Sequence, residues 1–575
     1  MKRMLRFLKH HKKESILAPL FKMLEALFDL MVPFIMADII NKGISSGDSR
    51  YVISRCGLMI LLGVIGLACS ITAQYFSAKA AVGACAKVRH ALFDRIQTLG
   101  FSDTDSLGTG TLITRMTSDV NQLQNGLNLF LRLFLRSPFV VVGAMVMAFI
   151  ISRKAGLIFV ITIPALSIVV FGIMLKTIPY FKNVQSRLDK ITGITRENLT
   201  GVRVVRAFSR EADETERFAD ANSLLMKSQL GVGRISALMN PLTFVIINVA
   251  IVAILKVSSI EVNIGTLAMG NVIALVNYMN QILLELVKLA NLIIQMTKAA
   301  ACAERIDAVL AMSPQMHFGS KKVQKESDHD AVRFDHVSLA YSGAGEASLS
   351  DISFTAKKGQ TIGIIGGTGS GKTSLVSLLP RYYDATEGTI EIFGHDIREY
   401  DKDSLRSSVS TVMQKAQLFS GTIRSNLTWG KKDASDDELW QALYAAQAAE
   451  IVKGKPKGLD EQVEQSGRNF SGGQKQRLSI ARSLVTDPQI LIFDDSASAL
   501  DYATDAALRK ALASLPGDMT VFIVSQRANS ISHADQILVL DEGRLVGRGR
   551  HEELLQNCQV YKDIYDSQFQ KAGEA

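Results

Sequence analysis

Residues 361–374 read TIGIIGGTGSGKTS: a short apolar run, a glycine-rich turn and the start of a second apolar run. The turn over 366–373 matches G-x-x-x-x-G-K-[ST], the P-loop. It lies between a predicted strand, 361–365, and a predicted helix, 374–379, as that motif requires. Glycines allow backbone N–H groups to curl around a phosphate, and the helix N-terminus adds its positive end. The stretch therefore predicts an α/β nucleotide-binding domain.

We expect every residue of this turn to contact a bound nucleotide. Lys372 would reach the β- and γ-phosphates, and the Thr373 hydroxyl would bind Mg²⁺. The predicted nucleotide-binding residues of the loop are Gly366, Gly367, Thr368, Gly369, Ser370, Gly371, Lys372, Thr373 and Ser374.

A second apolar run, 490–493, ends in two acidic residues. P-loop enzymes hold Mg²⁺ with a carboxylate at the carboxyl end of a strand beside the P-loop strand, and Asp494 is the predicted ligand. Asp495 follows at the position whose side chain usually activates the attacking water.

The segment 470–477, FSGGQKQR, resembles the LSGGQ signature of ATP-binding-cassette (ABC) ATPases. The family's other elements surround it in their usual order. By this resemblance Tyr341 stacks on adenine, Gln414 is the Q-loop glutamine and an Mg²⁺ ligand, and Asp501 belongs to a D-loop, 498–501. The implied cofactors are ATP and Mg²⁺. The signature residues that would contact a partner's ATP are Ser471, Gly472, Gly473 and Gln474.

Two positions depart from the family pattern. The catalytic glutamate is here Asp495, and the switch histidine is Gln526. The shorter aspartate withdraws its carboxylate by about 1 Å, and a misplacement of that size can cost about 10²-fold in rate. Glutamine cannot carry a proton as imidazole does, and general acid–base help is worth about 10²–10⁴-fold. We expect ATP binding with slow hydrolysis at this site; the alternative is that both changes are tolerated.

The chain before residue 320 has the composition of a membrane domain. Of 575 residues, 47% are hydrophobic and 21% charged, which excludes a disordered chain and fits an ordinary soluble enzyme poorly. Six apolar stretches approach the roughly 20 residues of a spanning helix. They are 16–40, 56–76, 127–151, 156–178, 241–257 and 267–294. The predicted fold is an α-helical six-span transmembrane domain, 1–320, followed by an α/β P-loop cassette, 321–575.

Lysine and arginine gather at the N-terminus and in the segments 77–126 and 179–236. The positive-inside rule therefore predicts a multi-pass protein with both termini in the cytoplasm. This distribution accounts for most of the net charge of +9, so no nucleic-acid partner is expected. Both segments look helical, and we expect them to extend helices beyond the bilayer lipid into water.

The whole chain resembles a type IV, exporter-fold half-transporter. In that class two half-transporters dimerise and enclose two ATP molecules, each between one chain's Walker motifs and the other chain's signature. The resemblance implies coupling helices near 104–111 and 207–213 that touch the cassettes.

With its two departures, the chain resembles the degenerate-site subunit of heterodimeric bacterial multidrug exporters. That resemblance implies ATP-driven efflux of amphipathic small molecules across the bacterial cytoplasmic membrane, with a partner half-transporter that supplies the catalytic glutamate and switch histidine. The alternatives are an importer of metal chelates on the same scaffold, a peptide or lipid exporter, and a non-transporting regulator gated by nucleotide.

Three charged residues, Lys22, Glu25 and Asp29, interrupt the first apolar stretch on one helical face. A charge at the bilayer centre costs roughly 2.5–3.5 kcal/mol, so these side chains need a partner or water. They form either a cavity wall that meets polar or cationic cargo or a structural cluster of salt bridges. Arg132 and Arg136, toward the cytoplasmic end of the third span, are expected to extend to lipid phosphates rather than to contact a substrate.

Overall fold

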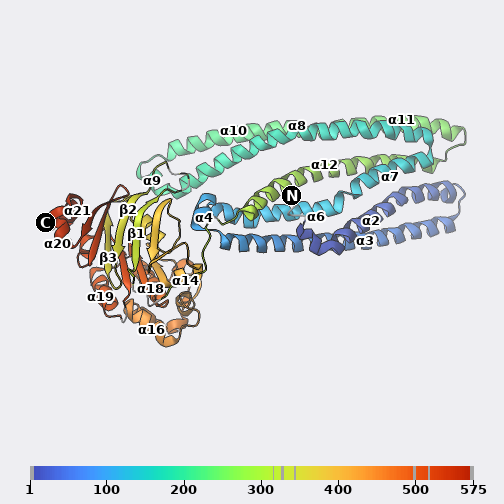
Figure 1. Ribbon diagram of the computed structural model, residues 1–575. Coiled ribbons are helices and arrows are strands. Elements are labelled where there is room, and N and C mark those ends of the chain that lie inside the picture. Colours follow the sequence, from blue (N-terminus) through green and yellow to red (C-terminus); the bar gives the residue numbers. More distant parts are fainter. Residues whose placement is uncertain are drawn as a thin grey trace. The chain divides into compact units, whose positions relative to one another are not determined.

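The computed structural model describes residues 6–314, 316–324, 329–341, 343, 345–496, 500–515 and 518–569. The chain forms two compact units, one largely helical and one built on β-sheets (Figure 1). The helical unit comprises Met1–Gln97 and Gly110–Met312, and the second comprises Thr98–Thr109 and Ser313–Ala575. The division after Met312 precedes the boundary expected at residue 320, and a short segment of the first half belongs to the second unit.

The helical unit consists of long helices joined by short turns. Their bounds are α2 Lys12–Asp38, α3 Ser49–Thr98, α5 Thr109–Thr114, α6 Val120–Leu133, α7 Arg136–Ile151, α8 Arg153–Thr200, α9 Val202–Ala207, α10 Glu211–Ala237, α11 Met239–Asn263 and α12 Met269–Ala311. Short π-helical turns lie at Ile39–Ile44 and Arg115–Asp119. Helix α12 packs against α2, α6, α7, α8 and α11, and buried apolar side chains of α2, α7, α8, α11 and α12 form the largest described core cluster of the unit.

Five helical segments of the described chain are long and apolar enough to cross a membrane: Ser49–Thr98, Thr109–Ile151, Arg153–Thr200, Glu211–Asn263 and Met269–Ala311. They contain five of the six predicted spans. The remaining one lies in α2, which includes Lys22, Glu25 and Asp29 among its apolar residues. A sixth span at α2 therefore stays a prediction.

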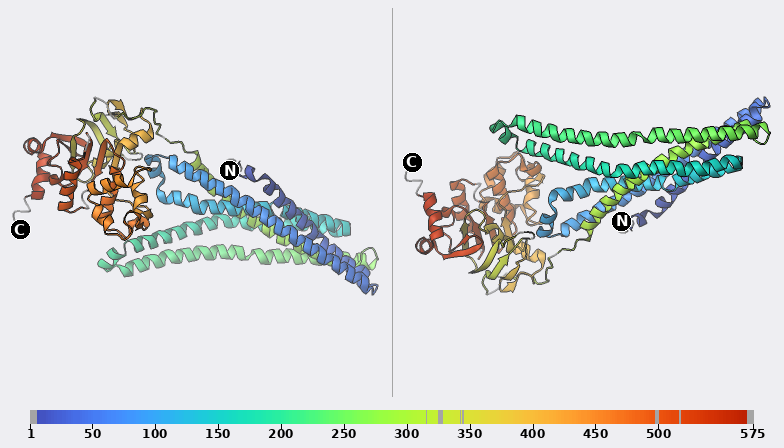
Figure 2. Two further views of the ribbon diagram at one scale, coloured as in Figure 1. Left: turned by 90° about the horizontal axis from the view of Figure 1, so that it is seen from below. Right: turned by 90° about the horizontal axis from the view of Figure 1, so that it is seen from above.

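Helices α3, α8 and α12 are much longer than a bilayer is thick, and α3 and α8 are the longest. Helix α3 has 50 residues and α8 has 48. At about 1.5 Å per residue each extends over about 70 Å or more, against about 30 Å for the hydrocarbon core. Helix α10 returns along α8, and Figure 2 shows this pair from two further sides. These lengths support helical extensions beyond the membrane, as predicted.

The short helices at the ends of these extensions begin earlier than predicted. Helix α4 spans Phe101–Leu107 rather than 104–111, and α9 spans Val202–Ala207 rather than 207–213. Glycines flank both helices, and one of them, Gly108, has a left-handed backbone that ends its helix. Gly100 precedes α4, and Gly108, with φ of 74°, ends it; Gly201 precedes α9. Helix α4 belongs to the second unit, where the Phe101 ring stacks on Tyr382 at 4.5 Å between centroids.

The second unit contains two main sheets. A four-stranded antiparallel sheet has the order β2-β1-β4-β5, and a six-stranded sheet has the order β12-β11-β3-β10-β9-β6. The strands are β1 Val332–Leu339, β2 Leu349–Ala356, β3 Thr361–Gly366, β4 Glu387–Ile392, β5 His395–Asp396, β6 Val409–Val412, β9 Ile490–Asp494, β10 Thr520–Val524, β11 Gln536–Asp541 and β12 Arg544–Gly549. A two-stranded ladder joins β7 Gly421–Thr422 to β8 Gln462–Val463.

Within the six-stranded sheet, β11, β3, β10, β9 and β6 run parallel, and only the edge strand β12 is antiparallel. Strand β9 is not beside the P-loop strand as expected, because β10 pairs with both β3 and β9 and lies between them. All three strands run parallel, so the P-loop and the two aspartates still leave the same edge of the sheet. Helices of the unit are α13 Lys372–Leu378, α14 Lys402–Ser408, α15 Ile423–Leu427, α16 Asp436–Ala445, α17 Ala449–Lys453, α18 Gly472–Leu484, α19 Tyr502–Ala513, α20 His551–Asn557 and α21 Gln559–Phe569. The predicted strand–loop–helix order around the P-loop is confirmed.

Candidate functional site

The P-loop is held in a shape that only glycine adopts easily. Gly369 and Gly371 have φ values of 84° and 94°, in the left-handed region. A Cβ on Gly371 would also lie 2.7 Å from the carbonyl oxygen of Ser348. Strain and close approach therefore both require glycine at position 371.

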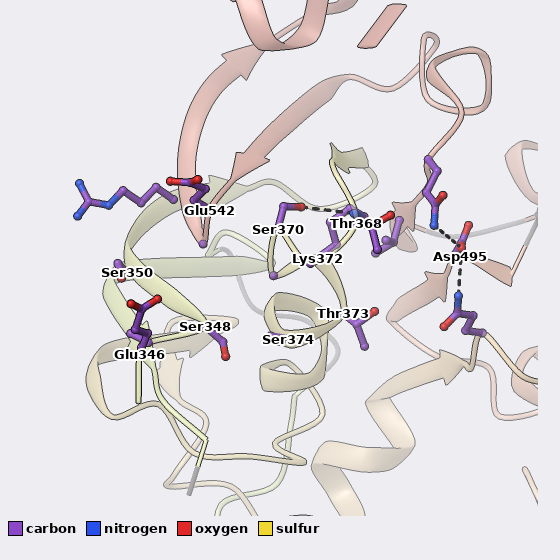
Figure 3. A pocket seen from close by; sticks show the side chains of 18 residues that line it. Glu346, Ser348, Ser350, Thr368, Ser370, Lys372, Thr373, Ser374, Asp495 and Glu542 are labelled. Carbon is purple, nitrogen blue, oxygen red and sulfur yellow. Dashed lines mark hydrogen bonds between the residues drawn. The ribbon is translucent and has the colours of Figure 1, made fainter. Parts of the chain in front are cut away.

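Lys372, the first residue of α13, points back into the curve of this loop. Its Nζ donates to the carbonyl oxygen of Gly366 at 3.0 Å and to that of Gly367 at 2.5 Å, and it lies 3.4 Å from Ser370 Oγ (Figure 3). Burial lowers the pKa of this ammonium, while the charges of Asp495 and Asp494 oppose that shift. Phosphate oxygens would be natural acceptors for a cation in this position.

Asp494 and Thr373 place two oxygens side by side at the end of the sheet. The Thr373 hydroxyl donates to Asp494 Oδ1 at 2.9 Å. Burial raises the pKa of Asp494, and the bond from Thr373 opposes this shift. Hard oxygen ligands of this kind suit Mg²⁺, which is usually held by one or two protein groups together with phosphates and water. No group of three or more His, Cys, Asp or Glu that could hold a metal occurs in the described part of the chain.

Asp495 is the meeting point of the Q-loop and switch positions. Its Oδ2 accepts from Gln414 Nε2 at 3.2 Å and from Gln526 Nε2 at 3.3 Å (Figure 3). Asp495 itself has a positive φ of 45°, a conformation that aspartate adopts more readily than most residues. Three residues separated by up to 112 positions in the sequence thus form one cluster beside the P-loop.

These groups line a hollow of about 1020 Å³. The predicted residues that line it are Thr368, Gly369, Ser370, Gly371, Lys372, Thr373, Ser374, Gln414, Asp495 and Gln526. Gly366, Gly367 and Asp494 contact these residues from behind through the hydrogen bonds of Lys372 and Thr373.

Sequence reasoning missed the opposite wall of the hollow. It is formed by Glu346 and Ser348, before β2, and by Glu542 and Arg544, at the β11–β12 turn. The turn itself has a local signal, because Glu542-Gly543 has positive φ at both residues, as a two-residue hairpin requires. Its position beside the P-loop follows only from the pairing of strand β11 with the P-loop strand β3, in which Leu540 is opposite Gly366.

Tyr341, the predicted adenine-stacking residue, lies at the start of the P-loop helix. Its hydroxyl donates to Ser374 Oγ at 3.0 Å. Its ring meets Tyr383 edge-on, with centroids 5.0 Å apart. The Tyr383 hydroxyl in turn donates to Asp105 of α4 at 2.6 Å.

The signature forms the N-terminus of α18. Ser471 caps this helix: its Oγ accepts from the Gln474 backbone N at 3.3 Å, and Gln474 Oε1 accepts from the Ser471 backbone N at 3.0 Å. Gly472 and Gly473 form the first turn, whose backbone N–H groups suit an anion. None of the four is among the described residues that line the P-loop hollow.

Asp501 caps α19, because its Oδ1 accepts from the Thr504 backbone N at 2.7 Å. This bond lowers the pKa of Asp501. The D-loop residues Ser498 and Ala499 lie outside the described residues.

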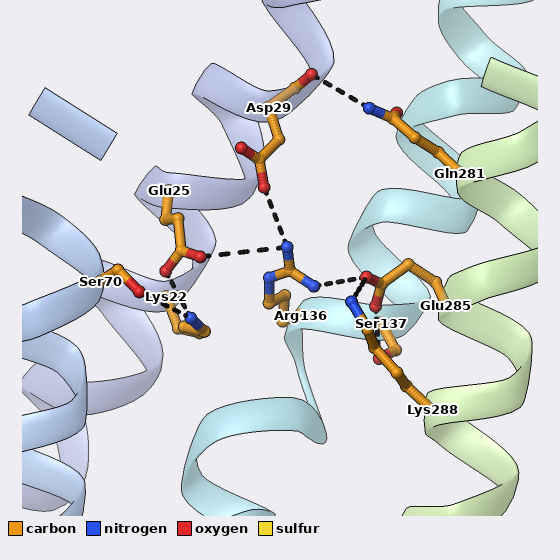
Figure 4. A network of polar contacts seen from close by, with 9 residues as sticks. All are labelled: Lys22, Glu25, Asp29, Ser70, Arg136, Ser137, Gln281, Glu285 and Lys288. Carbon is orange, nitrogen blue, oxygen red and sulfur yellow. Dashed lines mark hydrogen bonds and ion pairs between the residues drawn. The ribbon is translucent and has the colours of Figure 1, made fainter. Parts of the chain in front are cut away.

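The charged residues of α2 form a buried network in the helical unit. Lys22 Nζ lies 2.5 Å from Glu25 Oε2 and donates to Ser70 Oγ at 3.2 Å (Figure 4). Arg136 Nη2 lies 2.9 Å from Asp29 Oδ2, and its Nη1 lies 2.5 Å from Glu285 Oε1. These contacts are those of the salt-bridge alternative. Glu25 and Asp29 also line a hollow of about 300 Å³, whereas Lys22 is not among the described residues that line it, and a cavity wall that meets cargo stays a prediction.

The prediction that Arg136 extends to lipid phosphates is wrong. Its side chain is 10% exposed and points between α2 and α12, where three carboxylates lie within 4.0 Å of its guanidinium. Glu285, which anchors it, was missed. The available signal was a lone acidic residue in the apolar stretch 267–294. For Arg132 the prediction stays untested.

Comparison with known proteins agrees with this geometry. Family models match the ABC transporter transmembrane region at residues 15–286 and the ABC transporter at residues 349–498. An uncharacterized ABC transporter ATP-binding protein of Mycobacterium tuberculosis is 37% identical over 96% of this chain and 95% of its own length. A second one, from Bacillus subtilis, is 35% identical over 100% of this chain and 99% of its own length.

A further relative is the ATP-dependent lipid A-core flippase of Sodalis glossinidius, 30% identical over 97% of this chain and 96% of its own length. Among solved structures, a bacterial Atm1-family ABC exporter with ATP bound matches with a TM-score of 0.79. It covers 98% of both chains at 22% identity, which establishes a shared fold. The chain therefore belongs to the ABC transporter family, as an exporter-fold half-transporter that carries its membrane domain and its transport ATPase on one polypeptide.

Proposed function

We propose that this chain is one half of a heterodimeric exporter that uses ATP to drive amphipathic small molecules across the bacterial cytoplasmic membrane, with both termini in the cytoplasm. Its own ATP site hydrolyses slowly, and its signature completes the competent site of the partner. The observation that carries this proposal is the pairing of Asp495 with Gln526 on one wall of the P-loop hollow.

Both residues affect the same chemical step. A general base must come within about 2.6–3.2 Å of the proton that it removes, directly or through one water. Asp495 has a shorter reach than glutamate, and its Oδ2 already accepts two amide hydrogens. Gln526 offers an amide, which cannot take up or release a proton. The P-loop residues expected to bind the phosphates are unchanged from the family motif.

The residues in and around the hollow are chemically suited to bind ATP and Mg²⁺. The P-loop backbone and Lys372 would bind the phosphates, and Thr373 with Asp494 would hold Mg²⁺, which would supply charge neutralisation for the phosphates. Gln414 would join as a ligand by presenting its carbonyl oxygen, whereas here its Nε2 faces Asp495.

The signature supports a role toward a second chain. Ser471 and Gln474 fix the first turn of α18, and no member of the signature lines the hollow of its own chain. In a dimer of two half-transporters the N–H groups of this turn would face the partner's γ-phosphate.

The decisive experiment restores the family residues. The full complex is purified from its own host, its subunits are identified by native mass, and Asp495→Glu is combined with Gln526→His. We expect a one-to-one complex with a second half-transporter and a rise of at least about tenfold in hydrolysis at this chain's site. That site is isolated by mutating the partner's catalytic glutamate. No rise, with an intact signature in the partner, would refute the degenerate site.

Lipid transport is the second candidate. It is favoured by relatives that are named lipid A-core flippases, 30% and 28% identical to this chain. Stimulation of the reconstituted ATPase by a lipid but by no soluble amphiphile would favour it. Nucleotide binding without turnover in the assembled complex would instead indicate a regulator.

A further inference from the structure

The hollow of about 300 Å³ in the helical unit lies between α2 and α3. Its walls are mainly apolar, with Phe28 and Val32 from α2 and Leu62 and Leu67 from α3. At Gly63 and Gly66 of α3 an added Cβ would meet no heavy atom within 4 Å, so the space there is open. The volume is at the lower end of the roughly 300–1,000 Å³ of ligand sites.

The ionisable side chains that face this hollow are acidic. Among the described residues that line it, only Glu25 and Asp29 are ionisable. The cations that neutralise them, Lys22 and Arg136, lie behind the lining and are largely buried. The Asp29 side chain is 45% exposed, against 14% for Glu25, so Asp29 is the carboxylate that a ligand meets.

We infer that this hollow binds the charged group of a lipophilic organic cation, with Asp29 as its counter-ion. The inference rests on the proposed export of amphipathic molecules and names their charge. An apolar wall with one accessible carboxylate favours a cation with an apolar body, because burying an anion beside Asp29 and Glu25 would be opposed by like charge.

Arg136 makes this exchange possible. Its guanidinium has two ends: Nη1 is held by Glu285 at 2.5 Å, and Nη2 lies between Asp29 at 2.9 Å and Glu25 at 4.0 Å. When a ligand cation occupies Asp29, Nη2 turns toward Glu25 while Nη1 stays on Glu285. No buried charge is then left without a partner. The rearrangement therefore avoids the large free-energy penalty of an unpaired buried charge.

The exchange also changes how the helices are connected. Asp29 belongs to α2, Arg136 to α7 and Glu285 to α12, so Arg136 ties α2 to α12. Ligand at Asp29 removes the shorter of the two ties between Arg136 and α2. The site thereby links occupancy of the hollow to the packing of α2, a helix of the core.

The test uses two ions of one shape and opposite charge, tetraphenylphosphonium and tetraphenylborate, with the full complex in detergent. Equilibrium binding of each labelled ion and stimulation of ATPase are measured for the wild type, Asp29→Asn and Asp29→Glu. We expect Asp29→Asn to weaken phosphonium binding about tenfold or more, since a hydrogen bond or ion pair to a charged group is worth about 1.5–3 kcal/mol. Asp29→Glu should retain binding within about threefold, and Asp29→Asn should not weaken borate binding.

A matched control is Asp38→Asn. Asp38 lies on the same helix and is also ion-paired, to Lys42 at 2.9 Å, but it does not line the hollow. It should bind the phosphonium as the wild type does. Gly66→Val, which extends a side chain into open space, should weaken binding of the phosphonium without loss of thermal stability.

The outcomes separate this inference from the proposed function. Equal phosphonium binding by the wild type and Asp29→Asn, no binding by the wild type, or equal losses for both ions would overturn the cation site. Stimulation of ATPase by amphiphiles that is insensitive to Asp29 would leave export standing and refute the site. Binding of the phosphonium that depends on Asp29, with no stimulation by any amphiphile, would support the site and refute export of amphipathic molecules.

Discussion

The P-loop and the Arg136 network handle charge in opposite ways. The P-loop gathers its phosphate-binding groups from nine consecutive residues, 366–374, and the only side-chain cation among them is Lys372. The network gathers three carboxylates and their cations from positions 22 to 288, on helices α2, α7 and α12. One site is local in sequence, and the other exists only because the helices pack.

The difference follows from what each site binds. The P-loop uses backbone N–H groups, which any chain has, and needs glycine to aim them. The network holds side-chain charges in a low-dielectric environment, where each must have a partner within a few ångströms. A local motif can therefore be recognised from the amino-acid sequence, whereas an ion-pair network can be recognised only from the distances between side chains in the structure.

Removing Arg136, the central cation of the network, should give the largest effect, a loss in the free energy of unfolding. Arg136→Ala leaves Asp29 and Glu285 without their shared partner, and breaking a buried pair costs about 3–5 kcal/mol. Lys288 remains 2.8 Å from Glu285 and should hold the loss near about 3 kcal/mol. Thermal unfolding of the purified complex in detergent measures it.

The control for this variant is Arg55→Ala. Arg55 pairs with Asp38 at 3.5 Å but its side chain is 37% exposed, so its loss should cost less than about 1 kcal/mol. Equal shifts in unfolding temperature for the two variants would show that the Arg136 network is no more than a surface arrangement.

Removing Lys372, the cation of the P-loop, should lower the affinity for ATP rather than the stability of the fold. Lys372→Ala removes the ammonium from the curve of the loop, and we expect ATP to bind this chain's site about 10²-fold more weakly, the equivalent of one or two charge-assisted hydrogen bonds. Titration of the complex with a fluorescent ATP analogue tests this. The exposed Lys457→Ala serves as control, and a fall in unfolding temperature as large as that for Arg136→Ala would contradict the contrast drawn above.

Weakening the contact between α4 and the rest of the second unit should give the smallest effect, on the stimulation of ATPase. Tyr383→Phe keeps the ring against Tyr341 but loses the hydrogen bond to Asp105, a partly exposed bond worth about 0.5–1.5 kcal/mol. We expect unchanged ATP affinity and a few-fold weaker stimulation of ATPase by transported compounds. Tyr502→Phe, on an exposed ring, is the control. A loss of ATP affinity would show that Tyr383 acts on the nucleotide itself.

Much of the cassette could be predicted because its signals are local. The strand at 361–365, the helix after the P-loop and the strand at 490–493 all lie where apolar runs and the glycine turn indicate. The convergence of Gln414 and Gln526 on Asp495 could not be predicted, because it depends on strand order β3-β10-β9-β6. Glu346 and Glu542 were missed for the same reason.

In the helical unit hydropathy located five of the long helices but not what their charges touch. Arg136 was assigned to lipid because a helical pattern alone does not show which face another helix covers. The early end of α4 has a local cause in Gly108, whose positive φ stops the helix, whereas Gly201, before α9, has a negative φ that other residues also adopt.

The sequence by itself determined the family, the ATP-binding loop and the two residues that depart from the family pattern, Asp495 and Gln526, since each is recognised from a short stretch of consecutive residues. The tertiary structure alone decided that Gln414, Asp495 and Gln526 meet, and that Arg136 joins Asp29 to Glu285. The physical reason is that glycine, proline and hydropathy act over a few residues of backbone. A buried charge or an amide is satisfied by whichever group folding brings within about 3 Å, however distant it is along the chain.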